Sequence, residues 1–276
     1  MPSRPSVIRV ILVSATLFLP VLSARADDPQ ALKDRLHAVE KDTSLNGDDV
    51  QPFYLKMSVQ LFDNKGAPGD QGTVEMFWAN THKQKLIYSF PSYSATEVRV
   101  DNKVFRTAGS GVPPAMASSL LQQVMHPMAQ VSQIDKSNPQ MQKVTMGKMQ
   151  LDCIMLFPPI GVPVSLGLFP TYCLDPGDSA LRASTFGGQI MLHNMITVFK
   201  QRHIPLDVVI TARGVQAAEG KIEKMEGRDI ADADLSTDGL VIAPPAPVKV
   251  SGGVIAGLLL NKADPVYPIV AKGTAR

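Results

Sequence analysis

The chain has 276 residues, of which 45% are apolar and 19% charged, an ordinary globular composition that argues against disorder throughout. Lysine and arginine number 27 against 25 aspartates and glutamates, so the formal net charge of +2 gives no strong field to attract nucleic acid or an anionic membrane. No nucleic-acid partner is therefore expected.

The chain begins with the features of a cleaved secretory signal peptide. Arg4 and Arg9 make a positive start, residues 10–22 form a short apolar run, and the sequence Ala-Arg-Ala at 24–26 provides the small residues that a signal peptidase accepts. The alternative is an uncleaved anchor, but about 20 apolar residues are needed to span a bilayer. We predict a signal peptide over residues 1–26 and a periplasmic or secreted mature protein.

A helix and a meander of strands are predicted next. Residues 29–42 carry apolar side chains at helical spacing, behind a capping aspartate and a proline at the first helical position. In FYLKMSVQLFD, which starts at Phe53, the odd-numbered residues as far as Leu61 are apolar and share one face, as in a half-buried antiparallel strand. A turn-rich segment, 63–72, follows this strand. Further strands are expected at 73–80, 83–90, 94–100 and 103–108.

A second helix and a second run of strands complete the predicted domain. An apolar stripe at helical spacing, rich in methionine, runs through residues 113–131, where Pro127 ends or bends the helix. Strands are then predicted at 148–157, 170–176, 180–186, 189–201, 205–212 and 217–227. These elements predict an α+β protein, mainly antiparallel β, with a curved half-barrel sheet covered by one or two helices and a flexible C-terminal tail. The expected divisions are the sheet-rich domain at 27–238, a proline-rich linker at 239–250 and the tail at 251–276.

Cys153 and Cys173 are the two cysteines of the chain. After export they lie in an oxidising compartment, where two cysteines at this spacing favour a disulfide over free thiols. A metal site is disfavoured because the chain has no Cys-x-x-Cys pair and its five histidines lack ligand spacing.

Motifs of catalysis do not occur in the sequence. We found no Gly-x-Ser-x-Gly, no phosphate-binding glycine loop and no His-Glu-x-x-His, and Ser110 lacks the glycine spacing of a nucleophile elbow. The expectation is a protein that is not an enzyme and has no cofactor and no metal, with an unrecognised enzyme kept as an alternative.

The order of helix, meander, apolar helix and further antiparallel strands resembles the LolA/LolB-like lipoprotein carriers, whose fold is an unclosed barrel with helices over its cavity. The tail resembles the start of a TonB C-terminal domain, which implies membership of the TonB family with that domain truncated. The matching residues are Pro265, Tyr267, Pro268, Ala271 and Lys272. A flexible apolar tail is the alternative for this segment.

These resemblances imply a periplasmic, non-enzymatic module that binds lipid or lipoprotein acyl chains in an apolar hollow. The alternative is a remnant or partner of a TonB-dependent energy-transduction system that contacts outer-membrane or TonB-system proteins. The side chains predicted to line the hollow, with ordinary core as the competing interpretation, are Phe53, Leu55, Met57, Val59, Met76, Trp78, Leu120 and Met125.

Overall fold

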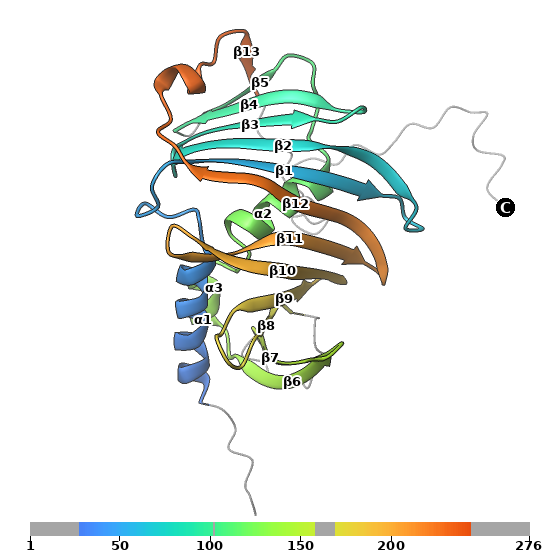
Figure 1. Cartoon of the computed structure of the whole chain (residues 1–276). Helices are drawn as coiled ribbons and strands as arrows, with labels where there is room; N and C mark the ends of the chain where they lie inside the picture. Colours follow the sequence, from blue (N-terminus) through green and yellow to red (C-terminus); the bar gives the residue numbers. More distant parts are fainter. Residues whose placement is uncertain (1–27, 102, 158–168, 244–276) are drawn as a thin grey trace, which may run out of the picture.

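A computed structural model describes residues 28–101, 103–157 and 169–243 (Figure 1). The helical elements are α1 (Pro29–Thr43), α2 (Ala115–Met125), α3 (Val131–Lys136) and the short 3₁₀ helix η1 (Asp232–Leu235). The strands are β1 (Phe53–Phe62), β2 (Pro68–Asn80), β3 (Lys83–Ser89), β4 (Ser94–Val100), β5 (Lys103–Thr107), β6 (Gln140–Met146), β7 (Met149–Met155), β8 (Thr171–Leu174), β9 (Leu181–Phe186), β10 (Gln189–Phe199), β11 (Arg202–Ala212), β12 (Val215–Gly227) and β13 (Leu240–Ile242).

The strands of the described residues form one antiparallel sheet in the order β13-β5-β4-β3-β2-β1-β12-β11-β10-β9-β8-β7-β6. Two meanders, β1 to β5 and β6 to β12, are joined edge to edge where β1 pairs with β12. The connection between the meanders carries α2 and α3, so that α2 crosses the sheet near its middle (Figure 1). The α+β class and the open, mainly antiparallel sheet are therefore as predicted.

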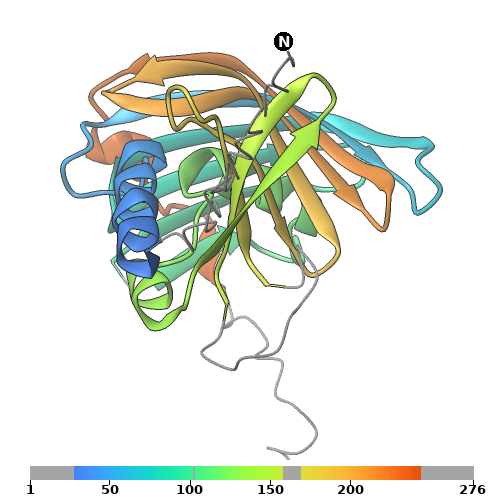
Figure 2. The same cartoon turned by 90° about the horizontal axis from the view of Figure 1, so that it is seen from below.

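The sheet curves, and α2 lies on its concave side, as the view from below shows (Figure 2). Helix α2 packs against β1, β11 and β12, whereas α1 packs against α3, β11 and β6. Gly220 on β12 lets α2 approach closely, because a Cβ atom there would lie 2.9 Å from Met57 Sδ and 3.3 Å from Leu120 Cδ1. A side chain at this position would push the helix away from the sheet.

An aromatic cluster forms part of the core between the two meanders. Phe53 and Trp78 face each other on β1 and β2, and their rings stack with centroids 5.3 Å apart. Phe199 of β10 meets Phe53 edge to face at 5.7 Å. Phe53 and Trp78 are fully buried, so this cluster ties β1 and β2 to the second meander through apolar contacts.

Some elements differ from those predicted. One helix was predicted within residues 113–131. In the structure α2 ends at Met125, and a second, short helix, α3, begins at Val131, where the predicted segment ends. Strand β6 was not predicted, since its side chains are mostly polar and exposed and give no alternating signal. Strand β13 lies in the segment predicted as linker and pairs with β5. The predicted signal peptide and the TonB-like segment lie outside the described residues.

Candidate functional site

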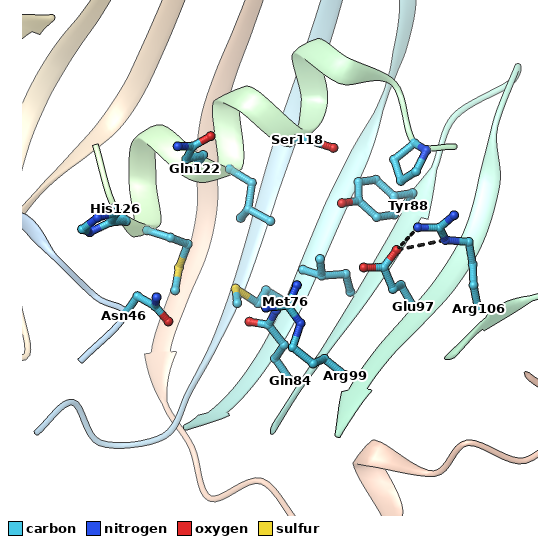
Figure 3. A pocket seen from close by; sticks show the side chains of 14 residues that line it. Asn46, Met76, Gln84, Tyr88, Glu97, Arg99, Arg106, Ser118, Gln122 and His126 are labelled. Carbon is cyan, nitrogen blue, oxygen red and sulfur yellow. Dashed lines mark hydrogen bonds and ion pairs between the residues drawn. The ribbon is translucent and has the colours of Figure 1, made fainter. Parts of the chain in front are cut away.

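A pocket of about 540 Å³ lies between α2 and strands β2 to β5 (Figure 3). It is lined by Asn46, Met76, Gln84, Leu86, Tyr88, Glu97, Arg99, Arg106, Pro113, Ser118, Leu121, Gln122, Met125 and His126. Its volume is within the roughly 300–1,000 Å³ that is common for small-molecule sites.

The two-residue alternation of strands and the helical spacing of α2 bring these side chains together. On β3, Gln84, Leu86 and Tyr88 alternate onto the concave face, and the register places Gln84 opposite Arg99 and Leu86 opposite Glu97 on β4. On α2, four residues at helical spacing line the pocket: Ser118, Leu121, Gln122 and Met125. The pocket therefore lies between one face of a helix and one face of a strand pair.

The other face of α2 packs on the middle of the sheet. Ala117, Leu120 and Val124 are buried in the main core together with side chains of β1, β11 and β12. Because α2 rests on these central strands, the concave surface of β3 to β5 is left beside the helix rather than beneath it. This offset opens the pocket.

The lining combines apolar and polar side chains. Met76, Leu86, Leu121 and Met125 are buried side chains that form the apolar walls. Glu97 of β4 and Arg106 of β5 form an ion pair in the lining, in which Arg106 donates from Nη2 at 2.6 Å and from Nε at 2.9 Å. Such a lining suits a molecule with an apolar body and a polar end.

Tyr88 adds a neutral hydroxyl to the pocket. Burial raises the pKa of Tyr88 to about 12, so the side chain keeps its proton at neutral pH. In Figure 3 its ring lies between Glu97 and the α2 residue Ser118. Tyr88 can therefore donate a hydrogen bond but does not act as a base at neutral pH.

The eight side chains predicted to line an apolar hollow are all buried. Met76 and Met125 line the pocket. The remaining six lie in the main core: Phe53, Leu55, Met57, Val59, Trp78 and Leu120. The polar lining residues, among them Gln84, Glu97 and Arg99, were not predicted from the sequence. Polar side chains at inward positions of alternating strands were the signal that could have indicated them.

A disulfide joins Cys153 and Cys173, which face each other on β7 and β8 with Cα atoms 3.9 Å apart. The predicted disulfide is confirmed, and its Cα separation suits a bridge between paired strands. These strands lie at the opposite end of the strand order from β4 and β5, away from the pocket. The disulfide is typical of proteins in an oxidising compartment.

His193 of β10 is a second buried polar group beside α2. Gln123 Oε1 accepts hydrogen bonds from His193 Nε2 at 3.0 Å and from Ser184 Oγ at 3.4 Å. Among the described residues, His193 Nδ1 has no partner. Burial lowers the pKa of His193 to about 4, so the imidazole is neutral at neutral pH.

Acidification is expected to destabilise the fold through His193. Its pKa is 6.5 when unperturbed and about 4 in the fold, so between these values the unfolded chain binds more protons than the folded chain. The stabilisation is complete above pH 6.5 and is lost as the pH falls towards 4, by up to about 3 kcal/mol. Urea unfolding of the wild type and of His193→Gln, at about pH 7 and pH 4.5, measures this difference.

The exposed His82 provides the control for this measurement. His82→Gln should lose as much stability on acidification as the wild type, whereas His193→Gln should lose less. Equal losses in all three proteins would show that another group causes the acid sensitivity.

Within the described ranges, no group of three or more histidine, cysteine or acidic side chains is arranged to hold a metal ion. None of the helices in the same ranges is both long enough and apolar enough to cross a membrane.

Comparison with known proteins finds solved structures of low similarity. No family model matches the chain, and no curated protein matches it. A solved LolA superfamily protein from Nitrosomonas europaea is 8% identical with a TM-score of 0.48, over 72% of this chain and 96% of that one. A domain from Vibrio parahaemolyticus named for outer membrane lipoprotein sorting is 8% identical with a TM-score of 0.49, over 76% and 98%.

A third solved structure is a DUF1329 family protein from Desulfovibrio piger. It is 12% identical with a TM-score of 0.41, over 76% of this chain and 98% of that chain. Similarity at this level does not identify a ligand. The chemistry of the residues that line the pocket is the guide to what binds there. The TonB resemblance of residues 251–276 stays a prediction.

Proposed function

We propose that this protein is a periplasmic, non-enzymatic module that binds the acyl chain of a lipid or lipoprotein in the pocket between α2 and strands β2 to β5. The observation that carries the proposal is the mixed lining of the pocket. Buried apolar side chains from the helix and the sheet line it together with polar side chains from β3, β4 and β5. An acyl chain with a polar end offers a partner to both kinds of side chain.

The dimensions of the fold support an open concave surface. A helix of 11 residues is only about 16 Å long, because an α-helix rises 1.5 Å per residue. Neighbouring strands are about 4.8 Å apart, so a helix of this length and width covers only a few strands. Helix α2 packs on β1, β11 and β12, and the pocket between it and strands β2 to β5 is left for another apolar group to fill.

At the pocket edge, Ser44, His126 and Glu40 come together in a cluster whose residue types also occur in serine hydrolases. Ser44 Oγ lies 3.1 Å from His126 Nδ1, and Glu40 Oε1 lies 3.7 Å from the same nitrogen. A serine hydrolase holds its acid and its serine on opposite ring nitrogens, so that the proton can pass between them. With both groups on Nδ1, this cluster suits a structural link between the ends of α1 and α2.

The direct test is displacement of an uncharged fluorescent acyl-chain probe from the purified protein. Saturable binding of the probe is expected, with displacement by single-chain fatty acids and lysophospholipids, because burying the chain against the apolar wall removes its surface from water. A short-chain acid such as butyrate, which offers the same charge without an apolar body, should displace the probe poorly. Absence of any saturable binding would refute the proposed function.

A further inference from the structure

We propose that the head group of the ligand is anionic and is bound by Arg99. This inference rests on the proposed function, since it names the chemical class of amphiphile that the same pocket takes. The shared chemistry is an acyl chain that ends in a negatively charged group of oxygen atoms, either a carboxylate or a phosphate.

Glu97 and Arg106, the other charged strand residues that line the pocket, are paired with each other. Arg106 donates two hydrogen bonds to one oxygen of Glu97, and its Nη1 also donates to the carbonyl of Gly111 at 2.8 Å. The side chains of Glu97 and Arg106 are only 14% and 20% exposed. This pair is therefore neutral as a unit and is held in place by its own hydrogen bonds.

Arg99 is exposed, and its side chain, unlike that of Arg106, has no ion-pair or hydrogen-bond partner among the described residues. The residue opposite it on β3 is Gln84, and the residue opposite it on β5 is Val104, so neither neighbouring strand offers a carboxylate at this position. Figure 3 shows the Arg99 side chain beside Gln84 and Met76 at the pocket. A guanidinium group with five N–H donors thus lies next to the apolar wall.

The position of Arg99 matches the geometry that an anionic amphiphile requires. Its strand borders the apolar wall formed by Met76 and Leu86, while the Gln84 amide beside it supplies a further hydrogen-bond donor. Arginine binds carboxylate and phosphate oxygens through two parallel N–H donors, and these charge-assisted hydrogen bonds are stronger than neutral ones. The chain of such a ligand would lie along the apolar wall, and its charged end would meet Arg99.

The test compares three ligands with the same dodecyl chain: dodecanoate, dodecyl phosphate and dodecanol. Each ligand is titrated against the uncharged fluorescent probe bound to one of four proteins: the wild type, Arg99→Gln, Arg99→Lys and Arg213→Gln. Arg213→Gln is the matched control, because it removes the same charge from an exposed position in the turn between β11 and β12. Circular dichroism confirms that each variant has the native sheet content.

For the wild type we expect at least one of the two anions to displace the probe at a concentration about tenfold lower than dodecanol does. Arg99→Gln should abolish this preference without changing displacement by dodecanol, Arg99→Lys should retain part of it, and Arg213→Gln should behave as the wild type. Preference for one anion over the other would identify the head group as a carboxylate or a phosphate.

Other results would overturn the inference in distinguishable ways. Equal displacement by all three ligands from the wild type would contradict an anionic head group and leave acyl-chain binding intact. If Arg99→Gln weakened displacement by dodecanol as much as by the anions, Arg99 would support the shape of the pocket and not bind the head group. If the probe did not bind at all, the proposed function would fail together with this inference.

Discussion

Replacing Ser118 by tryptophan is expected to weaken binding of acyl-chain probes by at least about tenfold, because the indole ring would occupy the space that the ligand needs. Ser118 is half-buried and faces the pocket from α2, near Tyr88 (Figure 3). The substitution adds bulk without introducing a buried charge. A loss of binding would then not arise from an unpaired ionised group inside the protein.

The control for this substitution is Ala115→Trp, which adds the same ring at an exposed position on the same helix that does not line the pocket. Displacement assays on the wild type and both variants measure the effect, and circular dichroism checks that both retain native structure. If Ser118→Trp were native in structure and bound the probe as tightly as the wild type, the ligand would not lie in this pocket.

Removing the Trp78 side chain is expected to lower the free energy of unfolding by about 3–5 kcal/mol, as is usual for deletion of a large buried aromatic ring. Trp78 is fully buried and stacks on Phe53 with ring centroids 5.3 Å apart. Trp78→Ala would leave a cavity at the junction of the two meanders. Urea unfolding followed by circular dichroism measures the change, because Trp78 is the single tryptophan and its fluorescence is lost in the variant.

Trp78→Phe is the matched variant. It keeps an aromatic ring against Phe53 and removes the indole Nε1–H, which has no hydrogen-bond partner among the described residues. Since a buried donor without a partner is itself unfavourable, we expect this variant to lose much less stability than Trp78→Ala. Equal losses in the two variants, or a loss below about 1 kcal/mol in Trp78→Ala, would contradict the tightly packed cluster.

Local patterns in the sequence predicted most elements correctly. The alternation of apolar residues from Phe53 to Leu61 indicated β1, and the helical spacing behind Asp28 indicated α1, in which Asp28 accepts a capping hydrogen bond from the backbone of Gln30. These patterns are readable because each element must put its apolar side chains on one face. Strand β6 was missed because its largely polar surface lacks such a pattern.

The sequence by itself determined the antiparallel class of the sheet and the main helix positions, because both depend on the periodicity of apolar residues. It also determined the pairing of Cys153 with Cys173, because this depends on their spacing and on the compartment of the protein. Only the tertiary structure decided which buried residues line open space. Leu55 and Met76 both lie on the concave face, yet Leu55 packs in the core and Met76 also lines the pocket. The physical reason is the placement of α2, a short helix that packs on β1, β11 and β12 and leaves a pocket between itself and strands β2 to β5. The pattern of apolar residues along one strand does not predict where α2 packs. That position depends on close packing between segments far apart in the sequence, such as Leu120 against Gly220.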